Sequence, residues 1–127
     1  HFMAMARYDV TKIYQVMRNL LSNAVKFTAP DKMIRVAIQK GSMHCGELPG
    51  AAYKVSVIDQ GMGLDKEELL TIFNKFTQGR KVKTGAGGVG LGLSICKRII
   101  DDHEGIIWAE QNEDNGTTFS FLLPALG

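Results

Sequence analysis

Between Asp9 and Phe27, apolar residues recur at intervals of three and four residues, which is the spacing of an amphipathic helix. Asp9 is a suitable N-cap at the start of this pattern, and Pro30 follows its end. We therefore predict a helix in this segment, with an apolar face made of Val10, Ile13, Met17, Leu20, Leu21 and Ala24.

Two segments that follow alternate between apolar and polar residues, and this alternation predicts strands. The second of them, residues 53–59, has Tyr53, Val55 and Val57 on one side and ends at Asp59. Residues 41–50 are expected to form the loop between the two strands. The first strand, residues 34–39, has one apolar side that we expect to be buried, formed by Ile34, Val36 and Ile38.

The second half of the chain repeats this alternation of helices and strands. The Asn115–Gly116 pair is a frequent hairpin signal, and a connection this short requires the last two strands to be antiparallel. We predict a short helix capped by Asp65 at residues 64–73 and a longer helix at residues 89–103. Two strands are predicted at residues 106–110 and 117–123.

This order of elements predicts an α+β fold. We expect a two-layer sandwich in which a mixed, mostly antiparallel sheet is covered on one face by about three helices. A chain of 127 residues with 45% apolar and 22% charged residues fits one globular domain. We assign residues 7–127 to that domain and interpret residues 1–6 as a cloning remnant.

The sequence gives no sign of export or of a structural metal. No apolar run approaches the roughly 18 residues of a membrane span, and the first residues lack the features of a signal peptide. Cys45 and Cys96 show no C-x-x-C spacing and no neighbouring His cluster. We therefore expect a cytoplasmic domain without direct membrane contact, although its parent protein can be membrane-anchored.

The formal net charge of +2 hides an asymmetry along the chain. Residues 69–100 contain six of the fifteen Lys and Arg residues and none of the thirteen Asp and Glu residues. Such a basic segment is either a solvated loop surface or a site for an anion. Within it, residues 74–88 are polar and contain several glycines, which is typical of a mobile loop.

The first helix carries a second, polar stripe. Gln15, Asn19, Asn23 and Lys26 lie on one side of the helix, away from the apolar face, and Phe27 borders them. Amides and a lysine in this arrangement are suited to a cation, phosphate groups and a flat ring. The alternative is an ordinary polar outer face.

Asp59 falls on the same side of its strand as Val55 and Val57, so its carboxylate is expected to point toward the core. A lone buried charge is costly and needs hydrogen-bond donors. These are either N–H groups of the following turn, residues 61–63, or the amino group of a ligand. A helix-capping role is the alternative.

Residues 85–93 are rich in glycine at the predicted start of a helix, where glycine is unfavourable by about 0.5 to 1 kcal/mol relative to alanine. Gly88, Gly90 and Gly92 leave main-chain N–H groups accessible at the positive end of that helix, which suits a phosphate. The segment formally matches the dinucleotide-binding pattern G-x-G-x-x-G, but no buried strand precedes it.

The chain contains four segments that look like the N, G1, F and G2 boxes of one protein family, in that order. They are residues 19–28, 59–63, 73–76 and 88–93. Over residues 9–124 the chain resembles the catalytic and ATP-binding domain of sensor histidine kinases, within the GHKL or Bergerat superfamily. The resemblance implies the Bergerat ATP-binding fold, with ATP and Mg²⁺ as ligands.

The resemblance also implies roles for the residues singled out above. Asn23 would be the Mg²⁺ ligand, with Asn19 one helical turn away supporting the metal and the phosphates. Lys26 would reach a phosphate, and Phe27 would pack near the adenine. Asp59 would accept a hydrogen bond from the adenine amino group, a charge-assisted bond worth about 1.5 to 3 kcal/mol.

Gly61 and Gly63 would let the main chain approach the adenine ring. Lys75 and Gln78 match lid positions that contact the γ-phosphate in relatives, although glutamine is a weaker phosphate ligand than the arginine frequent there. With Asn19, Asn23 and Lys26, these two form the implied catalytic set. The other implied nucleotide-binding residues are Phe76, Gly87, Gly88, Val89, Gly90, Leu91, Gly92 and Leu93.

Gyrase-like ATPases carry a water-activating Glu at the position that Asn19 occupies here, and an amide cannot act as a general base at neutral pH. This difference favours transfer of the γ-phosphoryl group to a protein histidine over hydrolysis. The chain's own histidines, at positions 1, 44 and 103, do not lie on a long dimerising helix. We expect the acceptor on a separate dimerisation and phosphotransfer domain of the same parent protein, with a response regulator downstream and no nucleic-acid partner. The alternative is a nucleotide-binding scaffold that does not transfer phosphate.

Overall fold

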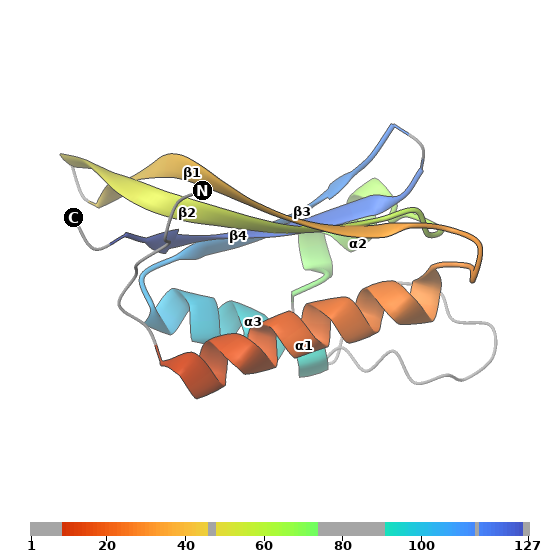
Figure 1. Cartoon of the computed structure of the whole chain (residues 1–127), viewed down its shortest axis with the longest axis horizontal. Helices are drawn as coiled ribbons and strands as arrows, with labels where there is room; N and C mark the ends of the chain where they lie inside the picture. Colours follow the sequence, from red (N-terminus) through yellow and green to blue (C-terminus); the bar gives the residue numbers. More distant parts are fainter. Residues whose placement is uncertain (1–8, 46–47, 74–90, 114, 126–127) are drawn as a thin grey trace.

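The protein folds as a four-stranded sheet with helices packed against it, seen in the computed structural model in Figure 1. The structure describes residues 9–45, 48–73, 91–113 and 115–125. Its elements are α1 (Val10–Phe27), β1 (Ile34–Cys45), β2 (Leu48–Asp59), α2 (Lys66–Thr71), α3 (Leu91–Asp102), β3 (Ile106–Gln111) and β4 (Thr117–Pro124). The predictions for residues 1–6 and for a loop at residues 74–88 lie outside the described ranges.

The strands lie in the order β1-β2-β4-β3, and α1 and α3 cover one face of the sheet (Figure 1). All three pairings among the described strands are antiparallel. The predicted α+β class and two-layer arrangement are therefore confirmed. Because β2 and β4 are the central strands, the end of β2 lies beside the start of β4 although the two are far apart in sequence.

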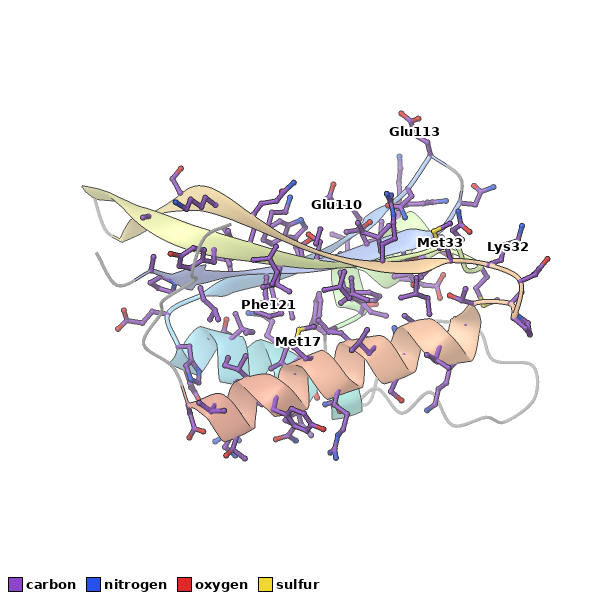
Figure 2. All side chains as sticks on the ribbon, viewed as in Figure 1. Met17, Lys32, Met33, Glu110, Glu113 and Phe121 are labelled. Carbon is purple, nitrogen blue, oxygen red and sulfur yellow. The ribbon has the colours of Figure 1, made fainter. Side chains whose placement is uncertain are left out.

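Helix α1 begins where its sequence predicts, but its apolar face differs at two positions: Val10 at the first turn is 70% exposed, and the buried Val16 was not in the predicted set. Asp9 is its N-cap, and one carboxylate oxygen of Asp9 accepts a hydrogen bond from the Lys12 N–H at 3.2 Å. The three fully buried residues of the helix are Val16, Leu20 and Ala24. Figure 2 shows Met17 of α1 and Phe121 of β4 pointing toward each other between the two layers.

Helix α2 has the predicted cap at Asp65, which forms a capping box with Glu68. The residues after the helix enter the core: Ile72 is 1% exposed, and the Phe73 ring packs edge-on against Phe119 at a centroid distance of 6.2 Å. The core joins both layers and consists of Val16, Leu20, Ala24, Val57, Leu64, Ile72, Leu93, Cys96, Ile99, Ile100, Ile107, Phe119, Phe121 and Leu123.

Two predictions about β1 are wrong. Residues 41–50 are not a loop, because β1 continues to Cys45 and β2 starts at Leu48. The apolar side of β1 is also not buried, since Val36 and Ile38 are 49% and 53% exposed. Strand β1 is the outer strand, and α1 packs against its neighbour β2, so the helical layer does not cover this edge. Local alternation reports which side a residue faces, but not whether anything covers that side.

His103 joins the start of α1 to the end of α3. Its Nε2 accepts a hydrogen bond from the Asp9 N–H at 2.9 Å, while its Nδ1 lies 2.7 Å from the Ile99 carbonyl oxygen. Since a carbonyl can only accept, Nδ1 is the protonated nitrogen in this arrangement. The contact fixes the angle at which α1 lies beside α3.

Cys96 of α3 is a fully buried free thiol facing α1, with its Sγ 3.9 Å from the Val16 carbonyl oxygen. Burial raises the pKa of this thiol from 9.0 to about 11, and a hydrogen bond with the Asn19 side chain opposes the shift. The thiol therefore stays neutral inside the interface between the two helices.

The shifted pKa of Cys96 predicts a loss of stability in alkali. Between pH 9.0 and about 11 the unfolded thiol releases a proton that the folded protein keeps, so the free energy of unfolding falls as the pH rises. Denaturant unfolding of wild type and Cys96→Ala across this range should show a steeper decline for wild type, by about 2 kcal/mol in total. Equal slopes would contradict the burial argument, and the comparison cancels titration of lysines and tyrosines.

Candidate functional site

The polar stripe of α1 faces the first turn of α3. Asn19 and Asn23 are partly buried, and the Asn19 Nδ2 donates a hydrogen bond to the Gly92 carbonyl oxygen at 3.2 Å. Arg18 and Ser22 are exposed, as predicted. The stripe is therefore not a merely solvated outer face, because the Asn19 amide bonds to α3 and Asn23 is partly buried.

The buried position of Asp59 is confirmed, since its exposure is 0%. Its Oδ1 accepts two main-chain hydrogen bonds, from the Gly61 N–H at 2.9 Å and from the Thr117 N–H at 3.1 Å. The donor from the following turn was predicted, but the donor from the start of β4 was not. Two donors on one oxygen fix the orientation of the carboxylate.

The turn after Asp59 is packed tightly against neighbouring main chain. A Cβ at Gly61 would collide with the Phe27 carbonyl oxygen at the end of α1, and one at Gly63 would collide with the Asn115 carbonyl oxygen. Gly63 also has a φ of +76°, which glycine adopts without strain. Glycine at these positions therefore brings the ends of α1 and β2 together with the β3–β4 turn.

Three buried side-chain atoms have no hydrogen-bond partner within the described ranges, and two of them, on Thr28 and Thr117, belong to residues where α1, β2 and β4 meet. The three atoms are Asn23 Nδ2, Thr28 Oγ1 and Thr117 Oγ1. Thr28 directly follows Phe27, and Thr117 donates its N–H to Asp59. Buried polar groups normally have partners, so this grouping is typical of a site that a ligand or water completes.

A cleft of about 330 Å³ opens beside Gly63, on the side of α2 and the end of β3. It is lined by Met62, Gly63, Leu64, Asp65, Glu68 and Gln111. The Asp65 and Glu68 carboxylates that border it already serve the capping box of α2. The turn at residues 61–63 is therefore open to solvent on one side.

Residues 8–127 match the family of histidine kinase-, DNA gyrase B- and HSP90-like ATPases. The chain belongs to this family. The resemblance that the four boxes suggested is therefore confirmed.

The relatives of this chain include sensor histidine kinases. Sensor histidine kinase WalK of Bacillus subtilis is 37% identical over 117 residues, which make up 91% of this chain and 18% of that protein. The solved catalytic domain of histidine kinase ThkA is 36% identical with a TM-score of 0.70, covering 94% of this chain and 70% of that one. Full-length ShkA, solved in complex with AMPPNP, is 25% identical with a TM-score of 0.68, covering 97% of this chain and 23% of that one.

The chain spans only a small part of its curated relatives, between 14% and 28% for three of them. Among the described helices, none is long and apolar enough to cross a membrane.

Several of the residues implied by the family motifs fall outside the described ranges: Lys75, Phe76, Gln78, Gly87, Gly88, Val89 and Gly90. Of the remainder, Leu91 and Gly92 form the first turn of α3, and Leu93 belongs to the core at 7% exposure. Lys26 is exposed near the end of α1. The structure thus brings together the described parts of the N, G1 and G2 boxes.

Sequence reasoning missed three residues at this junction: Thr28, Asn112 and Thr117. Asn112 follows β3, and its Nδ2 donates to the Asp59 carbonyl oxygen at 3.2 Å. The hairpin signal at Asn115–Gly116 located the turn, but nothing local indicated that β4 would lie beside β2. Only that pairing brings Asn112 and Thr117 to Asp59.

The two site glycines 61 and 92 should respond in opposite directions to alanine. Gly61→Ala places a methyl group against the Phe27 carbonyl and should lower the free energy of unfolding by about 1 to 3 kcal/mol. At Gly92 the nearest described atom to an added Cβ is Asn19 Nδ2 at 4.0 Å. Because alanine is more favourable than glycine in a helix, Gly92→Ala should raise the free energy of unfolding by up to about 1 kcal/mol. Denaturant unfolding measures both, and a destabilised Gly92→Ala would show that packing, not ligand access, requires glycine there.

Proposed function

We propose that this domain binds Mg-ATP and transfers the γ-phosphoryl group to a histidine on a separate dimerisation and phosphotransfer domain of the same parent protein. In this reaction the bond between the γ-phosphorus and the bridging oxygen breaks, a bond to an imidazole nitrogen forms, and ADP leaves. The observation that carries the proposal is the fully buried Asp59 carboxylate, which is bonded to Thr117, together with buried Asn23, Thr28 and Thr117 side-chain atoms that have no partner among the described residues.

Asp59 is proposed to select the adenine base. Two main-chain N–H groups orient the carboxylate through Oδ1, and in this orientation a base amino group would bond to the other oxygen, Oδ2. A buried carboxylate accepts a hydrogen bond strongly because little water competes with the donor. The unpartnered hydroxyls of Thr28 and Thr117 lie close to this carboxylate and would contact the base or a water beside it.

Asn23 and Asn19 are proposed to face the metal and the phosphates, with Lys26 adding charge at the end of α1. The carboxamide of Asn23 is partly buried and its Nδ2 lacks a partner among the described residues, so this side chain is available to a ligand, and amide oxygens suit Mg²⁺. The described ranges contain no cluster of three His, Cys, Asp or Glu residues. Nucleotide phosphates would therefore supply much of the coordination, and the ion would neutralise charge on them.

The glycine-rich segment is proposed to bind the phosphates through main-chain N–H groups, from Gly87 and Gly88 through Val89, Gly90 and Leu91 to Gly92 and Leu93. An anion at the start of a helix is favoured because the N–H groups of the first turn have no intrahelical acceptor. Phe76 would pack beside the nucleotide. Lys75 and Gln78 would contact the γ-phosphoryl group, where positive charge and hydrogen bonds stabilise the transition state.

Transfer is favoured over hydrolysis because position 19 holds an amide, whose Nδ2 is already bonded to Gly92. The names of its relatives support this direction: WalK and ThkA are histidine kinases, and ShkA binds AMPPNP. We assign residues 7–127 to this single domain. We place it in the cytoplasm, where a response regulator would receive the phosphoryl group from the histidine.

The base-reading role of Asp59 predicts a selective loss of affinity for ATP. Asp59→Asn removes the negative charge of the side chain and replaces one acceptor oxygen with an N–H donor. ATP affinity should therefore fall about tenfold or more. Affinity for ITP, which has a carbonyl in place of the amino group, should not fall. Isothermal titration measures both nucleotides, and unchanged ATP binding by the folded variant would contradict the role.

Phosphotransfer is tested with radiolabelled ATP, Mg²⁺ and the histidine-bearing domain of the parent protein supplied in trans. Wild type should label the histidine, whereas Asn23→Ala should label it at least about tenfold more slowly and should bind ATP equally with and without Mg²⁺. Arg18→Ala, an exposed position on the same helix, is the matched control. Normal Mg-ATP binding without transfer to the acceptor would instead identify a nucleotide-binding scaffold.

A further inference from the structure

We propose that Asn112 is a positioning residue that sets the adenine selectivity of this site by holding the β3–β4 turn against Asp59. This inference rests on the proposed role of Asp59 in reading the base. Asn112 belongs to none of the four family boxes and acts through its neighbours. Its side chain and main chain together contact β2, β4 and the turn itself.

The main chain of Asn112 closes the turn. Its N–H donates to the Gly116 carbonyl oxygen at 2.7 Å, and its carbonyl accepts from the Asn115 N–H at 3.1 Å. Asn115 has a φ of +73°, a left-handed conformation that asparagine tolerates better than most residues. Asn112 therefore determines where Gly116 and the next residue, Thr117, begin β4.

The side chain of Asn112 ties this turn to β2 and β4. Its Nδ2 donates to the Asp59 carbonyl oxygen at 3.2 Å, and its Oδ1 accepts from the Thr118 hydroxyl at 2.6 Å. The Asp59 carbonyl can only accept, so the amide must present its nitrogen there and its oxygen to Thr118. The two ends of one planar group thus fix the distance between two strands.

The Asp59 carboxylate depends on that distance. One of its two Oδ1 donors is the Thr117 N–H, which lies directly after the turn that Asn112 closes. Gly116 also packs against the Asp59 carbonyl oxygen so closely that no Cβ fits. If the turn moved away, Oδ1 would lose this donor, and the carboxylate would rotate from the orientation that the Gly61 and Thr117 N–H groups set together.

Rotation of the carboxylate would alter the direction in which Oδ2 meets the base, while the phosphate-binding residues of α1 and α3 would stay in place. The consequence is specific: affinity for the adenine amino group falls, and affinity for the rest of the nucleotide does not. A merely structural role would weaken every nucleotide alike.

The decisive variant is Asn112→Asp, which has nearly the same shape but replaces the Nδ2 donor with an oxygen facing the Asp59 carbonyl. Glu113→Ala is the matched control, because Glu113 lies in the same turn and Figure 2 shows its side chain pointing away from the molecule. Kd values for ATP and ITP are measured by isothermal titration of the whole chain, and thermal unfolding checks that each variant is folded.

Asn112→Asp should weaken ATP about tenfold and leave ITP unchanged, and Glu113→Ala should keep both wild-type affinities. Thr118→Val, which removes only the hydroxyl that orients the amide, should lower ATP affinity less and in the same selective manner. This variant carries the test if Asn112→Asp does not fold.

A folded Asn112→Asp or Thr118→Val with the wild-type ratio of ATP to ITP affinity would overturn the positioning role, as would an equal loss of both nucleotides. Failure of the proposed function has a different signature. In that case wild type itself would not bind ATP, or would bind ATP and ITP equally well.

Discussion

The buried carboxylate of Asp59 is the constraint on which the arrangement of this domain depends. A charge removed from water needs donors held at fixed positions, or its burial would cost several kcal/mol. Two of its donors, the Gly61 and Thr117 N–H groups, come from segments that only the central β2–β4 pairing brings together. Gly61 in turn contacts the end of α1. The same requirement therefore aligns a helix, a turn and two strands.

The site combines this well-bonded charge with groups that have no partner. Each buried polar atom without a partner costs about 1 to 3 kcal/mol, and the described part of the chain contains three of them, on Asn23, Thr28 and Thr117. The apolar core between α1, α3 and the sheet offsets that cost. A nucleotide that satisfies these groups would stabilise the folded state by linkage, so the unliganded domain is less stable than its fold allows. This combination is typical of binding sites built on a rigid scaffold.

Helix α1 connects the core to the site because one of its faces packs against the sheet and the other carries the polar site residues. Val16, Leu20 and Ala24 anchor it under the sheet, while the Asn19 amide bonds to Gly92 of α3. The helix is fixed at one end by the contact between Asp9 and His103 and at the other by the close approach of Phe27 to Gly61.

Helix periodicity, caps, the strand end at Asp59 and the hairpin turn were all readable from sequence, because each depends on residues within a few positions of one another. Four ordered motifs likewise identified the family. Three features were not readable from sequence. They are the exposed edge at Val36 and Ile38, the length of β1, and the positions of Thr28, Asn112 and Thr117 near the end of β2. They follow from the strand order β1-β2-β4-β3 and from where the helical layer ends. The sequence determined which groups the protein has to satisfy, and the tertiary structure decided which distant residues satisfy them, since strand pairing joins segments that carry no local signal of each other.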